Sequence, residues 1–547
     1  MPLPWIRSAW KHFAVVLVVA SVCGSLESAE SRSNETAQRI DQLLQEEHAI
    51  DQADPSPRCD DETFLRRVSL DITGQLPTPG KVTSFVLDPD EAKREKVVQR
   101  LLDEKEFGRN WGRYWRDVVM YRRNDDRGLI GAASLERHLT EQLNKNTPWD
   151  EVATGFITAK GDVREDGATG MIMAQVGRPE DTAAEISRIF LGVQIQCAQC
   201  HDHPTDRWSR EQFHELAAFF PRVAVRPRNN DGPRSFAVVA DDGPMIRRRP
   251  NGNNRFRGTP EHYMPDLEDP QARGTRMQPI FFLTDQEVDY GTADAKRRAA
   301  LAGMITAKDN PWFAKAFVNR IWAELVGEGF YPHVDDLGPD RDATSPKTID
   351  YLAEQFAASG YDVKQLYRTI TSTDAYQRQS QPRRSFKETP FAANCSQRLR
   401  SDQLFNALVH ALGIPDSPAR QADGPYGPRG GNAELRRVFG QTFSYDPSDP
   451  RDEVDGSIPQ ALALMNSPQL NQLISASPFT TLGRLLRSTP DNEDVVVELY
   501  LRCLARQPSE AELTHCLQYV KSTGDRDEAF EDMLWALINS TEFLYRK

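Results

Sequence analysis

The stretch FLGVQIQCAQCHDHPTDRWSREQFHELAAFF, from Phe190 to Phe220, holds the one Cys-x-x-Cys-His motif of the chain. Its members are Cys197, Cys200 and His201. Two thiols at this spacing suit the two vinyl groups of one haem, and the adjacent histidine suits the haem iron. The motif therefore indicates attachment of a c-type haem.

Helical signals surround the motif. Thr182 and Glu185 have capping-box spacing, and apolar residues follow at helical intervals. We therefore expect one helix that ends near Asp202 and brings the two cysteines and the histidine to one face, because residues three and four apart lie together. Ser209 and Gln212 have the same capping-box spacing and predict the start of the next helix.

Other interpretations of the motif remain open. Cys197 and Cys200 could hold zinc together with His201 and His203, or with Asp206 or His214, because paired thiolates and histidines suit a tetrahedral site. The two cysteines could also form a local disulfide or be plain buried thiols.

A second axial ligand to the iron is predicted at Met264, in the sequence EHYMPDL. A thioether is a common haem ligand, and a Met-Pro pair downstream of the attachment site is typical of small c-type cytochromes. We favour Met264 over Met171, Met173 and His214, because only Met264 has this setting.

The first residues predict export. Arg7, Lys11 and His12 precede an apolar run, FAVVLVVASVC, and small or polar residues follow, which is the order of a secretory signal. We expect a signal peptide over residues 1–28 and a protein in the periplasm or at the cell surface, with an uncleaved anchor as the alternative. An exported protein can carry c-type haem and disulfides.

Charge and composition exclude several classes of protein. The 547 residues carry a net charge of −13, and an acidic surface argues against general nucleic-acid binding. No later segment is apolar for long enough to cross a membrane. Seven cysteines are too few to hold such a chain together, so stability must come from packed cores. Acidic pairs such as Asp335 and Asp336 are expected on the solvated surface.

The fold class predicted from periodicity is mainly α. Helices with long irregular loops and a small β-containing excursion are expected, and a chain of 547 residues is too long for one core, so we expect two or more domains. The excursion lies in the loop-rich segment from Val223 to Thr284, where Phe236 to Ala240 is β-prone. Trp111, Tyr114 and Trp115 recur at helical spacing and are predicted to be core residues.

Cys503 and Cys516 are predicted to face each other in an antiparallel helical hairpin, with Ser509 and Glu512 as the capping box of the second helix. Cys516 lies about three residues farther from the turn, roughly 4.5 Å of helix rise. We favour a disulfide near the long end of the allowed separation, with two buried thiols as the alternative.

Several long motifs resemble a known family. The chain is similar to large secreted planctomycete proteins that join a cytochrome-c-like domain of unknown function to a second domain of unknown function. The resemblance covers nearly the whole mature chain and is carried by DDETFLRRVSLDITGQLPT, FLGVQIQCAQCHDHPTDRW, NPWFAKAFVNRIWAELVGEGF, PQALALMNSPQLNQ, LYLRCLARQPSEAEL and LWALINSTEFLYR. It implies two mostly helical domains, over residues 36–285 and 286–547, and export, but no reaction. Many relatives carry a further cytochrome-like module, which this chain lacks, so a multi-haem role is not expected.

The predicted function is binding of one c-type haem by an exported protein, for electron transfer or haem-dependent redox chemistry with a redox or cell-surface protein partner. The alternative is a cell-surface binding or scaffold protein in which the Cys/His cluster is a zinc or structural site. No substrate follows from the sequence.

Overall fold

The computed structural model describes residues 31–547, apart from 51–53, 229–234, 244–245, 248–254, 257–259, 270, 382–388, 415–431, 451–453 and 455. The predicted signal peptide over residues 1–28 lies outside the described residues. Within the described part of the chain, no helix combines the length and apolar character needed to span a bilayer.

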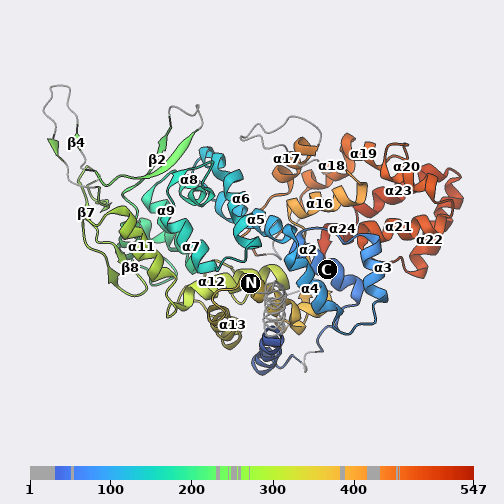
Figure 1. Ribbon diagram of the computed structural model, residues 1–547, viewed down its shortest axis with the longest axis horizontal. Helices are drawn as coiled ribbons and strands as arrows, with labels where there is room; N and C mark the ends of the chain where they lie inside the picture. Colours follow the sequence, from blue (N-terminus) through green and yellow to red (C-terminus); the bar gives the residue numbers. More distant parts are fainter. Residues whose placement is uncertain are drawn as a thin grey trace, which may run out of the picture.

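The fold is mainly α, as the periodicity predicted (Figure 1). After a helix over residues 31–48, the first half contains α2 (Asp61–Thr73), α3 (Pro79–Leu87), α4 (Lys93–Asp103), α5 (Lys105–Met120), α6 (Ala132–Asn144), α7 (Trp149–Thr158), α8 (Gly170–Ala174), α9 (Pro179–Ile186) and α10 (Arg210–Ala217). Short 3-10 or π helices lie between them at η2 (Asp126–Gly131), η3 (Gly167–Thr169), η4 (Ser187–Leu191) and η5 (Ile195–Gln199).

The second half continues with helices. They are α11 (Asp294–Ile305), α12 (Pro311–Val326), α13 (Pro346–Ala358), α14 (Val363–Ser372), α15 (Asp374–Gln377), α16 (Ser401–Leu412), α17 (Asn432–Phe443), α18 (Ile458–Asn466), α19 (Pro468–Ile474), α20 (Thr481–Ser488), α21 (Asn492–Leu504), α22 (Glu510–Thr523), α23 (Arg526–Ile538) and α24 (Thr541–Leu544).

The predicted β-containing excursion is present between α10 and α11. Strands β1 (Gly161–Asp162), β3 (Phe236–Ala240) and β2 (Val223–Pro227) form an antiparallel sheet in that order. Short antiparallel pairs follow: β4 (Ile246–Arg247) with β5 (Arg255–Phe256), β6 (Tyr263–Met264) with β7 (Thr275–Arg276), and β8 (Ile280–Phe281) with β9 (Gln286–Glu287). Later pairs are β10 (Ser380–Gln381) with β11 (Asn394–Cys395), which is parallel, and β12 (Gln397–Arg398) with β13 (Tyr545–Arg546), which is antiparallel.

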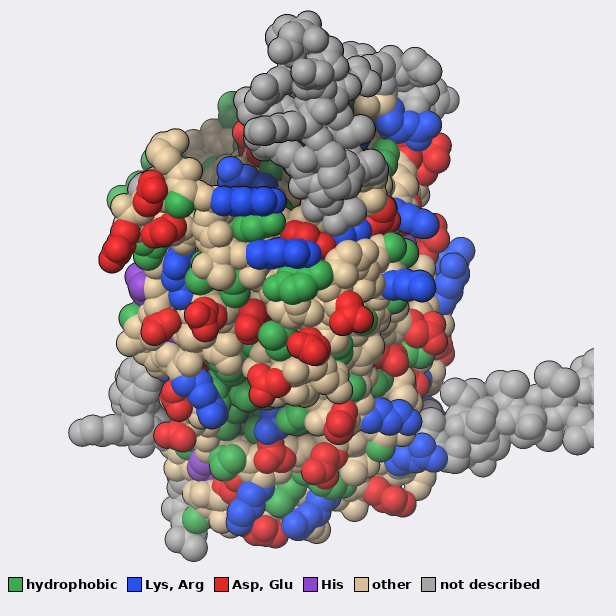
Figure 2. All heavy atoms as spheres, turned by 90° about the vertical axis from the view of Figure 1, so that its left-hand side faces the viewer, with side chains coloured by type: hydrophobic (Ala, Val, Ile, Leu, Met, Phe, Trp, Pro, Cys, Tyr) green, Lys and Arg blue, Asp and Glu red, His purple; other side chains and the backbone are tan. Residues whose placement is uncertain are grey.

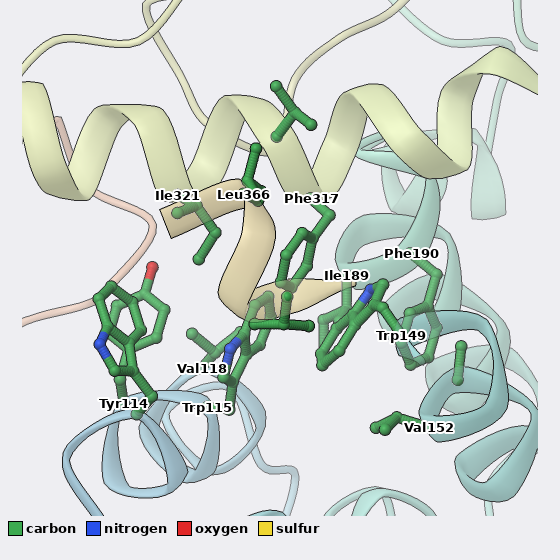
Figure 3. Close-up of a cluster of buried hydrophobic side chains, with 14 of the residues drawn as sticks. Tyr114, Trp115, Val118, Trp149, Val152, Ile189, Phe190, Phe317, Ile321 and Leu366 are labelled. Carbon is green, nitrogen blue, oxygen red and sulfur yellow. The ribbon is translucent and has the colours of Figure 1, made fainter. Parts of the chain in front are cut away.

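Aromatic side chains fill the centre of the larger core, where α5 and α12 meet (Figure 3). The ring of Trp115 stacks on Phe317, with centroids 5.6 Å apart and planes at 4°. Trp149 of α7 approaches the same phenylalanine at 4.4 Å between centroids. The expectation that Trp111, Tyr114 and Trp115 are core residues is confirmed, since each is almost fully buried.

The buried apolar side chains form two clusters. One is built mainly from residues 40–391 and the other mainly from residues 399–543. Helices α11 to α15 therefore share a core with α2 to α10, across the division predicted near residue 285. That division remains a prediction about domains, whereas the buried side chains separate near Leu399.

Helix α2 holds residues 542–547 through buried charged side chains. The Asp71 carboxylate pairs with Arg546 at 2.6 Å and accepts a hydrogen bond from the Tyr376 hydroxyl at 2.8 Å. Arg66 and Arg67, also buried, donate to backbone carbonyl oxygens of Cys503, Glu542, Phe543, Tyr545, Tyr376, Arg378 and Lys547. These contacts join the early helix to both cores.

The face of the molecule shown in Figure 2 carries acidic and basic side chains interspersed with one another. No broad basic area is visible on the described part of that face, which agrees with the acidic net charge.

Replacing Asp71 with Asn should lower the free energy of unfolding by about 3–5 kcal/mol, because it leaves the Arg546 charge buried without its partner. Urea denaturation followed by circular dichroism measures the change. Glu106→Gln is the control, because its 3.5 Å pair with Arg109 is largely exposed and such pairs contribute about 1 kcal/mol or less. Equal urea midpoints for the two variants would contradict the role given to Asp71.

Candidate functional site

The Cys-x-x-Cys-His motif does not lie on the long helix that its flanks predicted. Helix α9 begins at Pro179 and ends at Ile186, and the π-turn η4 follows. Gly192 then ends the helical run with φ +65°, and a Cβ there would lie 2.8 Å from a methyl group of Leu337. Thr182 is buried inside α9 and does not cap it. The helix stops early because a distant segment packs closely against Gly192.

The two cysteines lie on the 3-10 turn η5 and at its end. Ile195 and Ala198 point into the protein and are fully buried, whereas Cys197 and Cys200 are exposed free thiols. Residues three apart eclipse each other in a 3-10 helix. The turn therefore presents both thiols to solvent on one side. The predicted helix would also have placed the two cysteines on one face.

His201 follows directly and is exposed. Its Nδ1 atom lies 2.7 Å from the carbonyl oxygen of Asp202. A carbonyl oxygen only accepts, so Nδ1 donates, and in the neutral ring Nε2 then keeps its lone pair. Ligating histidines in proteins are held in this way, with one nitrogen donating to a backbone carbonyl and the other free for the metal.

The loop after the motif is tied to α10. The predicted capping box of Ser209 and Gln212 is confirmed. Just beside it, the backbone N–H of Arg210 donates to the Asp202 carboxylate at 2.9 Å. Within the loop, the His203 N–H donates to the Trp208 carbonyl at 2.8 Å. The loop over residues 201–208 is therefore closed on itself.

Asp335 anchors the residues before the motif, and the expectation that it is solvated is wrong. It is 1% exposed and accepts hydrogen bonds from Gln194 at 2.7 Å and from Arg188 at 3.0 Å. Burial acts to raise the pKa of Asp335, but Arg188 and Arg320 outweigh burial and hold that pKa well below its usual range. The buried charge is thus fully compensated, and Gln194 is fixed just before η5.

A pair of buried histidines is hydrogen-bonded to the turn that carries the two cysteines. His214 Nε2 lies 3.1 Å from the carbonyl oxygen of Gln199, which lies between the two cysteines, and His214 Nδ1 lies 2.8 Å from His262 Nε2. The carbonyl accepts from Nε2–H, so Nδ1 accepts from His262. Burial lowers the pKa of both histidines to about 4. His214 therefore has both nitrogens engaged and is a support of the turn.

Sequence reasoning did not find this pair. His214 occupies the buried side of α10 beside Phe213, and this position on the apolar stripe was the available signal. Its partner is 48 residues away, so the pairing could not be read from local spacing.

Met264 lies on β6 and is half-buried. Arg210 donates to the Gln199 carbonyl at 3.4 Å and to the Pro265 carbonyl at 2.6 Å, which places the backbone of the Met264 segment beside the turn. The role of Met264 as a ligand stays a prediction. Met171 and Met173 are fully buried in the larger core and act as packing residues.

The zinc alternative has no preformed site in the described part of the chain. Among those residues, no three His, Cys, Asp or Glu side chains are grouped so as to hold a metal ion. Cys197, Cys200, His201 and His203 share one loop, but zinc binding would require that loop to rearrange.

The predicted disulfide between Cys503 and Cys516 is wrong. Both are free, and the Cys516 sulfur lies 3.9 Å from the Tyr500 hydroxyl. The capping box of Ser509 and Glu512 is confirmed, so the hairpin forms as expected. The offset along the two helices, about 4.5 Å of rise, explains why the thiols do not meet.

Two family models match the chain. Residues 39–225, which include the motif, match "PSCyt2: Protein of unknown function (DUF1549)". Residues 297–428 match "PSD1: Protein of unknown function (DUF1553)". The chain thus carries two domains of unknown function. The comparisons with curated proteins and with solved structures gave no match.

The reduced protein should react with a maleimide at Cys197 and Cys200 well before any other described cysteine. Cys59, Cys395, Cys503 and Cys516 are buried, and burial raises the pKa of Cys503 to about 12, which keeps that sulfur protonated and unreactive. Mass spectrometry of labelled peptides measures the order. Cys503→Ser is the control and should leave the fast phase unchanged; fast labelling of Cys503 itself would contradict the structure.

Proposed function

We propose that this protein attaches one c-type haem through Cys197 and Cys200, with His201 as iron ligand, and serves electron transfer or haem-dependent redox chemistry outside the cytoplasm. The observation that carries the proposal is one turn that presents two exposed free thiols, followed by a histidine whose Nδ1 is held and whose Nε2 is uncommitted. The predicted export signal would bring the chain to a compartment where such attachment takes place.

The two thiols and the imidazole of this motif have the chemistry needed to hold a c-type haem. Each thiol would add its S–H across one vinyl double bond, which forms a thioether and needs no oxidant. His201 would offer its Nε2 lone pair to the iron, while the Asp202 carbonyl fixes the ring. A haem held in this way supplies one-electron chemistry at its iron.

An orphaned donor in the same loop adds support. The Nε1–H of Trp208 is buried without a hydrogen-bond partner among the described residues, and the indole packs edge-on against Phe282 at 4.9 Å between centroids. A buried donor without an acceptor costs about 1–3 kcal/mol. A carboxylate of the bound group, such as a haem propionate, would satisfy it.

The hydrogen bonds that hold the turn in place suit a redox centre. Gln199 is held by His214 and Arg210, and Gln194 by Asp335, so the residues on both sides of Cys197 are fixed by buried or half-buried partners. A rigid attachment loop keeps reorganisation on electron transfer small. The partner is proposed to be a redox or cell-surface protein.

Expression in a strain that exports the chain and attaches haem tests the proposal. The purified protein should show a Soret band that survives acid–acetone extraction, because thioether bonds resist that treatment. The double variant Cys197→Ser/Cys200→Ser should lose the extraction-resistant band. The matched control Cys503→Ser/Cys516→Ser removes two buried thiols and should keep it.

Absence of the band together with stoichiometric zinc would contradict the haem proposal and favour the alternative, a cell-surface binding or scaffold protein with a zinc site. Absence of both would favour a purely structural role for the cysteines.

Met264→Ala should abolish the weak sulfur-to-iron band of the oxidised protein and leave the haem covalently attached, since the thioether would be one ligand and the cysteines hold the porphyrin. Met465→Ala is the matched control, because Met465 is exposed on α18. An unchanged spectrum in Met264→Ala would reject this residue as the sixth ligand.

A further inference from the structure

A segment without charged residues lies far along the chain from the motif. From Gly456 to Gly483 the sequence contains no Asp, Glu, Lys or Arg, in a chain where 27% of residues are charged. The segment folds into α18, α19 and the turn that leads to α20, which lie along the upper right of Figure 1. A long uncharged segment normally indicates burial, so its exposure needs an explanation.

The apolar residues of this segment are exposed. Leu464 is the one fully buried side chain of α18, whereas Ile458 is 77% and Leu462 is 52% exposed. Phe479, on the turn between α19 and α20, is 89% exposed. Single exposed apolar residues are ordinary, but Ile458 and Leu462 lie four residues apart on one face of α18, and a contiguous apolar set marks an interaction surface.

A groove lies on the same surface. It holds about 280 Å³ between α17 and α18 and is lined mainly by apolar side chains, among them Leu435, Val438, Phe439, Leu462, Ala463 and Pro468. Such a groove accepts an aromatic side chain, which is a common kind of anchor at protein interfaces.

Phe479 is held in position as a projecting side chain. Arg484 donates to the Phe479 carbonyl at 2.8 Å, and Arg487 donates to the Pro478 carbonyl at 2.7 Å. Thr480 caps α20 immediately afterwards. The turn is therefore ordered before any partner arrives, and insertion of the ring would cost little conformational entropy.

We propose that the groove between α17 and α18 receives Phe479 of a second copy of this chain, and that the reciprocal contact forms at the same time. Two features select a second copy as the occupant. Identical chains of net charge −13 repel each other, and the segment from Gly456 to Gly483 adds no charge of its own to that repulsion. Phe479 and the groove also both belong to the row of helices from α17 to α20 along one edge of the molecule in Figure 1, so a two-fold axis can pair both contacts and close the assembly.

Sedimentation velocity of the full exported chain over a range of concentrations tests the proposal. The protein should form a dimer. Phe479→Ser, which removes the ring, and Leu462→Glu, which puts a charge in the groove, should each weaken dimerisation about 30-fold or more, the size expected of an interface hot spot. Leu87→Ser is the control, because Leu87 is 75% exposed on α3, and it should leave the dimer intact.

Mixing the two variants gives a sharper result. The Phe479→Ser chain keeps its groove and the Leu462→Glu chain keeps its ring, so an equimolar mixture should form mixed dimers through one intact contact, at concentrations where each variant alone stays monomeric. Unchanged thermal melting of each variant shows that the fold is preserved.

A wild-type chain that stays monomeric, or a dimer that survives both variants, would overturn the proposal. Flotation with phosphatidylcholine–phosphatidylglycerol vesicles covers the other use of such a surface. A monomer that floats with the vesicles and loses this property in Phe479→Ser would assign the surface to a membrane and overturn the second copy as its occupant.

Discussion

The buried pair of Asp71 and Arg546 is the contact on which the arrangement of the two cores depends. It joins a residue of α2 to one that follows 475 positions later, and the Tyr376 hydroxyl satisfies the second carboxylate oxygen. Two charges taken out of water are tolerated only when their hydrogen bonds are complete. The neighbouring Arg66 and Arg67 add bonds to carbonyl oxygens on both sides of Leu399, where the two cores separate, so α2 works as the common support of the molecule.

Local signals predicted local structure well. The capping boxes at Ser209 and Ser509 start helices as expected, and the aromatic spacing around Trp115 identified the core face of α5. The predictions failed where a segment far away in the sequence decides the local conformation. Leu337 packs on Gly192 and ends the helix that periodicity extended to the motif. Asp335 was expected on the surface, because nothing near it in the sequence points to its partner Arg188, which is 147 residues away.

The same distinction between local and long-range contacts applies to the candidate site. Spacing alone singled out Cys197, Cys200 and His201, since all three lie within one short stretch of chain. The support beneath them was invisible in the sequence, because His214 and His262 meet only after the β-containing excursion folds back onto α10. The disulfide in the hairpin of α21 and α22 was predicted wrongly for a different reason. The two helices face each other as expected, but Cys503 and Cys516 lie at different distances from the turn that joins them.

The contacts of α2 also bear on when the molecule can fold. Arg66, Arg67 and Asp71 are made early, but their partners in residues 542–547 are translated last among the described elements. At about 5–20 residues per second the ribosome needs roughly half a minute or more to cover the distance. Until then Arg66, Arg67 and Asp71 lack their partners in residues 542–547, although Arg67 and Asp71 can already bind Tyr376. The charges buried on α2 therefore find their last partners only after the residues of the larger core have been translated.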